Sequence, residues 1–508
     1  HTVLGERKLS YEEHGSLHTL YKADHQKFID YNIRDVDLVD RIDQETGLMD
    51  LALVIAYKGG VNYPDVFGTT GIWDSIIYRY LNERKVAIPP SKAKRKDSYP
   101  GGYVKDPRVG MSEWVTSFDL NSLYPNLIVQ YNMSPETLLR APSDKLTHGV
   151  DHYLQDADPI HPAQRARDIS VAANGSTYRK DKQGVLPEII VGLYDERRTT
   201  KDKMLETQQE FEKTKNSELK REINRLNNTQ QAVKILLNSL YGALGNQYFR
   251  YYELEMAEGI TLSGQLSIKW AEKAINNYMN KLLGTDSDYV IAIDTDSLYV
   301  DMKPLVDKVN PKDPVKFIDE ACQKKFEPVL EKAYDDLYKR MNAYENRMVM
   351  AREAIADRGV WTAKKRYILN VHNNEGVQYA EPKLKIMGIE AVKSSTPQVV
   401  RDKFKQAYKI ILNGSEQELQ KFVSDFYEEF KSLPAEAVSF PRGVSELTKW
   451  SDRTTTYKKG TPIHVRGALL FNSKMKELGI DKYMEGIKDG SKVKFCYLKT
   501  PNPLRENV

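Results

Sequence analysis

Two aspartates stand two residues apart in the stretch AIDTDSLY, at Asp294 and Asp296. In an extended segment, residues i and i+2 point the same way, so both carboxylates face one side of the chain. Carboxylates this close raise each other's pKa unless a cation lies between them. Asp is also a common turn former, so a turn without chemistry is the alternative. The pair therefore indicates either an acidic turn or part of a metal site.

A third carboxylate, Asp119, closes the run WVTSFDL, which is typical of a β-strand. The following NSLYP turns the chain, and Pro125 helps to fix that turn. Mg²⁺ takes one or two carboxylates and completes its octahedron with water and phosphate oxygens. Two such ions about 3.5–4 Å apart activate an attacking oxygen and stabilise a leaving one. The three aspartates together therefore predict phosphoryl-transfer chemistry.

Cations recur at helical spacing on two segments between positions 187 and 245. The cations are Arg197 and Lys201 on the first segment and Lys234 on the second. Asn238 and Tyr241 follow Lys234 at the same helical spacing. Residues at i, i+4 and i+7 share one helix face. Each cation alone is typical of a solvated surface, but together on two facing helices they could hold a triphosphate. Gly242 and Gly245 remove side-chain bulk and would allow a base pair or another backbone to approach.

Hydrophobic periodicity predicts the elements that position these groups. Residues 1–90 are mostly helical in character, and a loop rich in Pro, Lys and Gly follows at 88–110. Segments 188–215 and 219–245 form an antiparallel helical hairpin if the chain turns near Asn216 and Ser217. The run YVIAIDTDSLYVDM predicts a β-hairpin. After about residue 385, charged helices alternate with loops, as in a separate lobe.

Two stripes of apolar residues support the helices predicted at 25–44 and 219–245. Segment 25–44 places six apolar side chains at the spacing of one helix face, and the second helix of the hairpin has a stripe of leucines. The first set is Phe28, Ile29, Ile33, Val36, Val39 and Ile42, and the second is Leu236, Leu237, Leu240 and Leu244.

The composition is that of a globular protein of several domains, without a disulfide framework or a membrane span. The chain has 508 residues, 40% of them hydrophobic, which predicts roughly three or four domains. The net charge of +4 does not by itself indicate nucleic acid, although basic clusters at 92–97 and 362–367 are more suggestive. Two cysteines exclude a disulfide framework and favour a reducing compartment. No apolar run reaches the 18 or so residues of a membrane span, so no membrane is expected.

Six ordered motifs resemble those of one enzyme family. DLNSLYP (119–125), KILLNSLYGALGN (234–246) and IDTDSLYV (293–300) are similar to the three polymerase motifs of family B DNA polymerases. YPGGYV (99–104), AKKRY (363–367) and EPKLKIMGIEAVKSSTP (381–397) resemble further elements of that family. The likeness points to replicative polymerases of T-even-like bacteriophages and covers nearly the whole chain.

The resemblance implies an α+β fold shaped as a polymerase right hand. It would have a palm with an antiparallel sheet, fingers made of a helical hairpin and a mostly helical thumb, preceded by the end of an RNase H-like 3′–5′ exonuclease domain. The implied ranges are 1–90 for the exonuclease remnant and its connection to the palm, 91–186 for the first part of the palm, 187–241 for the fingers, 242–385 for the second part of the palm and 386–508 for an incomplete thumb.

The resemblance also implies roles at the metal site. Asp119, Asp294 and Asp296 would be the catalytic carboxylates, and Asp119 and Asp296 would bind metal with the carbonyl oxygen of Leu120. Glu353 would lie near the metals. Two Mg²⁺ ions are expected, with Mn²⁺ able to replace them.

Further residues would contact the substrates. The ring of Tyr124 would lie under the sugar and exclude a 2′-OH, the group that distinguishes RNA precursors. The implied nucleotide-binding residues are Ser122, Leu123, Tyr124, Arg197, Lys201, Lys234, Asn238 and Tyr241. The implied DNA-binding residues are Tyr99, Gly101, Gly102, Lys364, Lys365 and Tyr367.

The expected activity is template-directed DNA synthesis in viral replication: a primer 3′-OH attacks the α-phosphate of a dNTP and releases pyrophosphate. Two other hypotheses are a catalytically dead DNA-binding module and a two-metal nuclease. The retained carboxylates argue against the first, and the second leaves Tyr124 and the hairpin cations without a role. The family further implies primer–template DNA, dNTPs, a sliding clamp and other replisome proteins as partners, in the cytoplasm of an infected bacterium.

Two departures from the family pattern lead to expectations of their own. Ile293 stands where the family often has Gly, so the geometry of the D-T-D turn is expected to differ slightly. YNIRD, with Tyr31 and Asp35, resembles the last exonuclease motif, although a plain amphipathic helix explains it too. We expect either a fragment or one half of a split polymerase, without proofreading in this chain and with a separate exonuclease chain as a partner in the second case.

Overall fold

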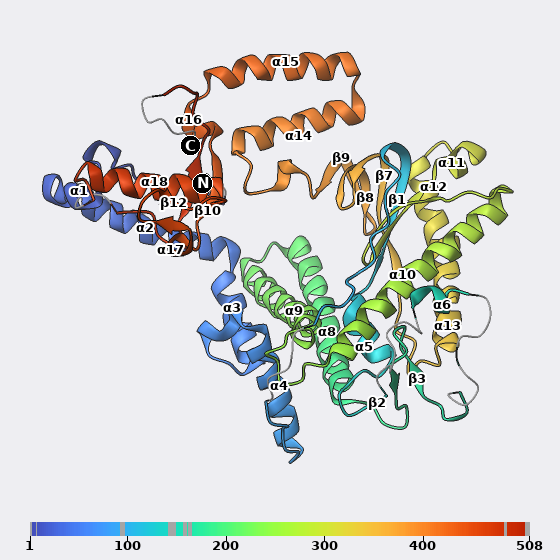
Figure 1. The fold of residues 1–508 in the computed structure, drawn as a ribbon. Coiled ribbons are helices and arrows are strands. Elements are labelled where there is room, and N and C mark those ends of the chain that lie inside the picture. Colours follow the sequence, from blue (N-terminus) through green and yellow to red (C-terminus); the bar gives the residue numbers. More distant parts are fainter. Residues whose placement is uncertain are drawn as a thin grey trace. The chain divides into compact units, whose positions relative to one another are not determined.

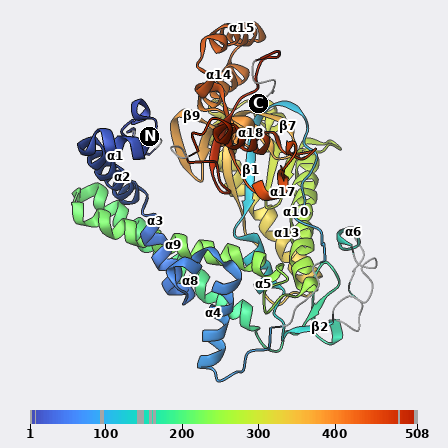
Figure 2. The same ribbon diagram turned by 60° about the vertical axis from the view of Figure 1, so that its left-hand side comes forward.

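The computed structural model of the chain forms two compact units (Figures 1 and 2). The larger contains Gly47–Lys365 and Leu369–Lys383, and the smaller contains His1–Thr46, Arg366–Ile368 and Leu384–Val508. The structure describes residues 3–6, 8–91, 97–140, 149–155, 160, 165–481 and 485–502. Most of the basic cluster predicted at 92–97 therefore lies outside the described residues.

A six-stranded sheet lies mostly in the larger unit, with its strands in the order β5-β6-β1-β7-β8-β9 (β1, β7, β8 and β9 are labelled in Figure 1). Its strands are β1 (Gly110–Leu120), β5 (Val290–Asp294), β6 (Ser297–Asp301), β7 (Met350–Ala363), β8 (Arg366–Asn374) and β9 (Val377–Met387). β1 pairs antiparallel with β6 on one side and with β7 on the other. Val115, Phe118 and Leu120 of β1 are buried in the core. The predicted mixture of helices and antiparallel sheet is confirmed.

Helices pack against this sheet and against each other. α10 (Leu254–Leu283) contacts both α13 (Glu327–Arg340) and α5 (Leu123–Gln130). The other small elements of this unit are α6 (Val150–Tyr153), α11 (Lys303–Val309), α12 (Pro314–Ala321), the π-helical turn Cys322–Phe326, and a three-stranded sheet of β2 (Leu138–Arg140), β3 (Ser170–Val171) and β4 (Thr177–Tyr178).

The predicted helical hairpin is present as α8 (Val185–Thr214) and α9 (Ser217–Leu244), which lie side by side in Figures 1 and 2. Lys215 takes a left-handed backbone conformation, and the Asn216 side chain accepts a hydrogen bond from the Glu218 amide at 3.0 Å. The turn therefore lies where the sequence predicted it. The four leucines of the α9 stripe are buried, as expected.

Two helices that precede the sheet hold the hairpin in place. α3 (Leu48–Gly59) and α4 (Thr69–Glu83) both pack against α9. The buried indole of Trp73 on α4 donates to the Leu236 carbonyl at 3.2 Å and to the Ser239 hydroxyl at 3.0 Å. Aromatic burial with a satisfied N–H fixes α9 firmly against α4.

The smaller unit is mainly helical. Its helices and strands include α1 (Leu17–Ala23), α2 (His25–Thr46), α14 (Gln398–Asn413), α15 (Glu416–Ser432), α16 (Ala435–Val438), α17 (Leu447–Trp450), α18 (Ile463–Glu477), β10 (Phe440–Gly443), β11 (Ser451–Asp452), β12 (Thr456–Tyr457) and β13 (Lys492–Phe495). The helix predicted at 25–44 is confirmed as α2. Its apolar stripe, however, stays largely exposed, with Ile33 at 62% and Val36 at 64%.

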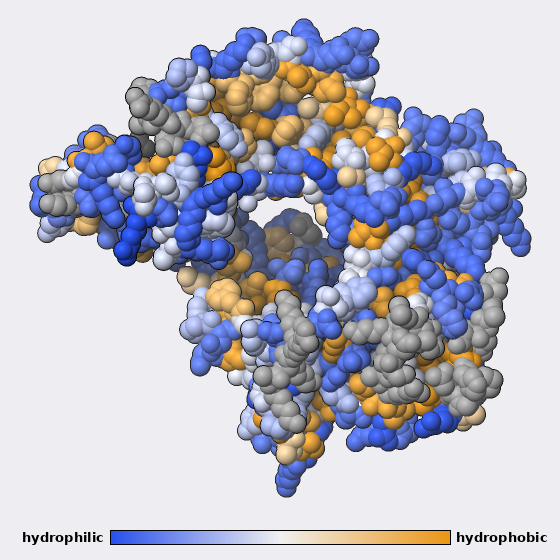
Figure 3. All heavy atoms as spheres, viewed as in Figure 1, coloured by the Kyte–Doolittle hydropathy of each residue, from blue (hydrophilic) through white to orange (hydrophobic). Residues whose placement is uncertain are grey.

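The surface seen in Figure 3 is largely hydrophilic, as expected for a chain in which 29% of the residues are charged. Hydrophilic side chains cover most of the face shown in Figure 3, with apolar patches between them. None of the described helices is long and apolar enough to cross a bilayer.

The two cysteines differ in environment, which gives a test of the core. Cys322 is fully buried, and burial raises the pKa of its thiol, whereas Cys496 is partly exposed. Since the thiolate is the reactive form, we expect a thiol reagent to modify Cys496 rapidly and Cys322 only after unfolding. Counting modified thiols with and without denaturant checks this, and equal rates in the native protein would contradict the packing around Cys322.

Candidate active site

The three predicted aspartates meet at one end of the sheet. Asp119 on β1 lies opposite Ser297 of β6, whose hydroxyl donates to the Asp119 carboxylate at 2.6 Å. The Leu120 amide donates to the Asp296 carbonyl at 2.9 Å. β5 and β6 form the predicted hairpin, with Asp294 opposite Ser297. The structure therefore brings together carboxylates from two separate motifs.

The turn of this hairpin depends on Thr295, which has a positive φ of 61°. The Thr295 amide donates to the Tyr103 carbonyl at 2.9 Å, which ties the turn to the loop 99–104. Ile293 was expected to alter the turn, but it is an ordinary buried strand residue paired with Leu298. The unusual backbone lies two residues further on, and the expected difference from the family's turn stays a prediction.

The carboxylates repel one another. The pKa of Asp296 is raised to about 6, first by burial and then by the negative charges of Asp119, Asp294 and Glu353. Glu353 lies on β7 and accepts a hydrogen bond from the Ser117 hydroxyl at 3.0 Å. A bound cation would relieve this repulsion.

The carboxylates of the site fit Mg²⁺, although, among the described residues, the structure does not hold them together as a complete set of metal ligands. Within the described part of the chain, no three His, Cys, Asp or Glu side chains converge as a ready metal cluster. Mg²⁺ needs only one or two protein carboxylates, because water and substrate phosphates complete its shell. Asp119 and Asp296, beside the main chain of Leu120, supply that chemistry.

A cation that the sequence assigned to DNA binding also lies at this site. Lys365, in the two-residue turn between β7 and β8, pairs with the Asp294 carboxylate at 3.0 Å. Its backbone is left-handed, with φ of 60°. Lys364 beside it pairs with Asp106 at 3.1 Å. Sequence spacing carries no signal for the contact between Lys365 and Asp294.

A cleft of about 1130 Å³ joins the sheet end to the helical hairpin. Asp119, Ser122 and Glu353 line one side of the cleft, and the hairpin residues Arg197, Lys201 and Lys234 line the other. Among the described residues, none of these three cations forms an ion pair, and the Arg197 Nε is buried without a hydrogen-bond partner. The cleft therefore presents unpaired positive charge opposite carboxylates.

Arg352 is a cleft residue that the sequence did not single out. It is 7% exposed, lies next to Glu353, pairs with Asp319, and donates to the Asn373 side-chain oxygen at 2.7 Å. A single Arg in a strand of alternating polar and apolar residues does not indicate from the sequence that it will be buried and paired in a cleft.

Tyrosines form a second cluster beside the aspartates. The rings of Tyr124 and Tyr241 lie 4.4 Å apart, and the Tyr241 and Tyr99 hydroxyls are 3.3 Å apart. Burial, and then the charge of Asp296, raise the pKa of Tyr124 to about 12, so its hydroxyl stays protonated. Gly245 accommodates the Tyr99 hydroxyl, whereas open space surrounds Gly242.

The remaining predicted site residues are spread over both units. Leu123 is buried in the core, so only its main chain could meet a ligand, and Asn238 is exposed on α9. The Gly101 carbonyl accepts from Gln265 at 2.6 Å. Tyr367 is buried on β8 in the smaller unit.

The two residues of the exonuclease-like motif lie on α2 of the smaller unit. The Tyr31 ring makes an edge contact with Tyr11, with 5.3 Å between centroids. Asp35 pairs with Lys8 at 2.8 Å. Their predicted role in an exonuclease remnant stays a prediction.

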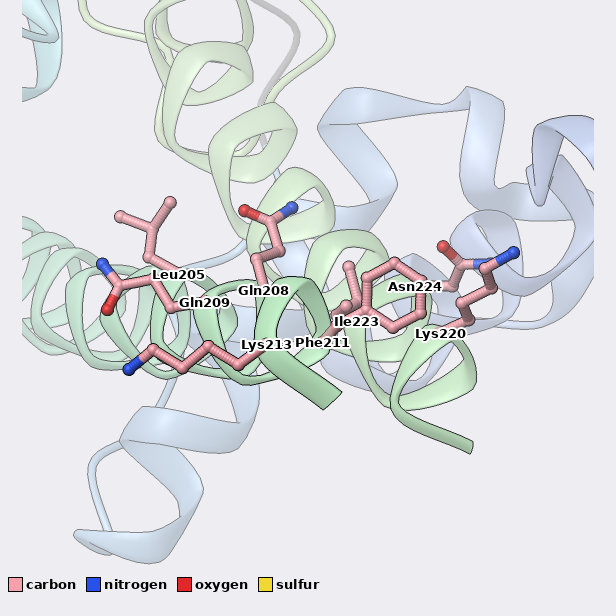
Figure 4. A pocket seen from close by; sticks show the side chains of 8 residues that line it. All are labelled: Leu205, Gln208, Gln209, Phe211, Lys213, Lys220, Ile223 and Asn224. Carbon is pink, nitrogen blue, oxygen red and sulfur yellow. The ribbon is translucent and has the colours of Figure 1, made fainter. Parts of the chain in front are cut away.

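A separate pocket lies near the turn of the hairpin, where side chains from both α8 and α9 line it (Figure 4). Phe211 has Lys215 at 5.5 Å and Lys220 at 5.6 Å from its ring centroid. The pocket is distant in sequence from the aspartates, and none of the predicted site residues lines it.

The comparison with protein families agrees with the geometry. Residues 71–478 match the model of DNA polymerase family B. The chain belongs to this family. It is 34% identical, over 98% of its length, to the DNA-directed DNA polymerase of Enterobacteria phage T4 and equally to that of Escherichia phage RB69. It is 27% identical, over 71% of its length, to DNA polymerase 1 of Pyrococcus abyssi and covers 39% of that protein.

The predicted likeness to polymerases of T-even-like phages is therefore confirmed. The chain spans 60% of the length of each of the two phage relatives.

Two neighbouring glycines of this family B chain provide a matched test of the site. A Cβ on Gly102 would lie 2.8 Å from the Thr295 side chain and 3.1 Å from the Tyr124 hydroxyl, whereas one on Gly101 meets nothing within 4 Å. We expect Gly102→Ala to lower the free energy of unfolding by about 1–3 kcal/mol. Gly101→Ala should change it by less than about 0.5 kcal/mol. Denaturant midpoints compare the two, and equal effects would contradict the close approach.

Proposed function

We propose that this chain carries a template-directed DNA polymerase that adds dNMP units to a primer 3′-OH and releases pyrophosphate during viral DNA replication. The observation that supports it best is the cleft with Asp119 and Glu353 on one side and unpaired Arg197, Lys201 and Lys234 on the other. Carboxylates suit divalent metals, and the cations suit a triphosphate.

In this proposal Asp119, Asp296 and the Leu120 carbonyl hold two Mg²⁺ ions, which Mn²⁺ could replace, with Asp294 and Glu353 nearby. Bound ions would favour deprotonation of the primer 3′-OH and stabilise the charge on pyrophosphate. Family membership makes a requirement for divalent metal the natural expectation. Lys365 would offset the charge of Asp294, to which it is paired at 3.0 Å.

The nucleotide would lie between the hairpin and the start of α5. Arg197, Lys201 and Lys234 would bind its phosphates, and preorganised charge of this kind stabilises a transition state. Ser122 leads into α5 without a side-chain cap, so the Leu123 and Tyr124 amides at the helix N-terminus could also bind phosphate oxygens.

The sugar and base would meet the aromatic cluster. The Tyr124 ring, tilted against the ring of Tyr241, would form the floor under the sugar, where it would exclude a 2′-OH. Asn238, exposed on the same helix as Tyr241, would border the nascent base pair.

The helices and strands of the chain would form the palm, fingers and thumb of a polymerase. The sheet and its helices would form the palm (91–186 and 242–385), α8 and α9 the fingers (187–241), and 386–508 the thumb, with 1–90 as the exonuclease remnant and connection. Primer–template DNA would contact Tyr99, Gly101, Gly102, Lys364, Lys365 and Tyr367. Binding should weaken with salt, because phosphate contacts release counterions. A sliding clamp, other replisome proteins and the infected bacterial cytoplasm follow from the family.

Primer extension with Mg²⁺ and dNTPs tests the activity. Because Asp296 is a proposed metal ligand that is buried beside other carboxylates, Asp296→Asn should slow extension by about 100-fold or more. Asp336→Asn, on an exposed pair of α13, should leave the rate unchanged. A folded parent chain that binds primer–template but never extends it would refute the proposal for this chain.

The hairpin cations are tested separately, at low dNTP concentration. Lys234→Ala should raise the KM for dNTP by about 10- to 100-fold, the equivalent of one charge-assisted hydrogen bond. Lys220→Ala on the same helix lies outside the cleft and should leave KM unchanged. Equal KM values for both variants would remove Lys234 from the proposed phosphate site.

A further inference from the structure

A third, smaller cavity of about 220 Å³ lies at the base of the helical hairpin, and neither the aspartates nor the hairpin cations line it. Its walls come from α4, the segment after α4, the turn after α5 and the first turn of α8. Ile77, Leu81 and Leu186 are buried there. The described lining contains no Lys or Arg and is mostly apolar, apart from Ser134, Glu136 and Tyr251, so it favours an apolar, uncharged occupant.

One polar group in this lining has no partner. Tyr251 is 8% exposed, and its hydroxyl forms no hydrogen bond within the described residues. Burial raises the pKa of Tyr251 to about 12, so the hydroxyl remains a neutral donor at physiological pH. A buried donor left unpaired is destabilising, and a ligand that supplies an acceptor would remove that cost.

The other polar groups of the lining are already occupied. The Glu136 carboxylate accepts from the Val185 amide at 2.6 Å and from the Ser134 hydroxyl at 2.7 Å. The Pro89 carbonyl accepts from Arg250 at 2.9 Å. Tyr251 is therefore the group left to orient a ligand.

We propose that this cavity is a binding site for a small uncharged molecule with an apolar ring and one hydrogen-bond acceptor, which the Tyr251 hydroxyl engages. An apolar cavity of about 150 Å³ holds benzene. The 220 Å³ available here leaves room for a ring with a short polar substituent.

The location gives the site a consequence for the hairpin. The turn after α5 caps α8, because the Gly184 amide donates to the Asn132 side chain at 2.8 Å and the Leu186 amide to the Ser134 hydroxyl at 3.3 Å. Tyr251 follows the end of α9. An occupant would contact the first turn of α8 and Tyr251, and would so restrain the base of the hairpin where α8 begins. Any effect on nucleotide addition rests on the proposed function, whereas the binding does not.

The test measures binding directly on the full chain, so it does not depend on polymerase activity. Acetophenone supplies one ring and one carbonyl acceptor, and 2-phenylpropene has the same shape without the acceptor. Ligand-observed NMR titrations compare both probes on the parent, on Tyr251→Phe and on Val185→Phe, which fills the cavity from its half-buried rim. Thermal unfolding verifies that each variant folds, and amide exchange of Val185 and Leu186 reports the location.

We expect acetophenone to bind with a dissociation constant of about 1 mM, a reasonable affinity for a ligand of this size. Tyr251→Phe should weaken it by about 3- to 10-fold, as loss of one neutral hydrogen bond requires. Val185→Phe should abolish binding, and exchange at the start of α8 should slow in the complex. Absence of saturable binding, or binding that neither variant changes, would overturn the site. Equal affinity of the parent for both probes would overturn the role of Tyr251, even if a variant failed to fold.

Discussion

The end of β1 is tied to the β5–β6 turn, and the rest of the site depends on this connection. The Leu120 amide bonds to the Asp296 carbonyl, and the Ser297 hydroxyl bonds to Asp119. Since β1 lies between β6 and β7, its register sets the position of Asp119 against both Asp296 and Glu353. A slip of one residue would move Asp119 to the opposite face of the sheet. Backbone pairing, together with the Ser297 hydrogen bond, therefore keeps mutually repelling carboxylates together.

Opposite the sheet, three cations of the hairpin line the cleft. The order in α9 comes from its buried leucines and from Trp73 of α4, which bonds to Leu236 and Ser239. Within the part of the chain that the structure describes, Arg197, Lys201 and Lys234 form no ion pair, so they are available to an anion that enters the cleft. Because apolar packing holds α9 in place, the cations that line the cleft are not needed for its stability and can bind a ligand.

Local features of this fold could be predicted from the sequence. The hairpin turn at Lys215 and Asn216 interrupts two strongly helical segments, and the turn chemistry acts over a few residues. The same holds for the β-hairpin around Thr295, whose flanking strands are apolar on both sides. Of the candidate site, the sequence supplied the aspartates and the cations, because ordered motifs identified them.

Contacts between distant residues could not be predicted. Lys365 reaches Asp294 through a left-handed turn, and no propensity requires a lysine to adopt that conformation. Arg352 gains its partners Asp319 and Asn373 from elements far away in the chain. On α2, periodicity correctly predicted a helix but not whether its apolar face would be covered, since Ile33 and Val36 are exposed. Each of these outcomes depends on tertiary neighbours that a single sequence does not reveal.

The backbone of Thr295 places local strain between the two aspartates of the turn. A β-branched residue at φ of 61° occupies a region that costs it roughly 1–2 kcal/mol relative to glycine. Glycine there would relax the turn, yet it would also let Asp294 and Asp296 sample more orientations. The fold and the chemistry therefore make opposite demands on position 295. Under the proposed function, a version of this protein stabilised at position 295 would for that reason be a poorer catalyst.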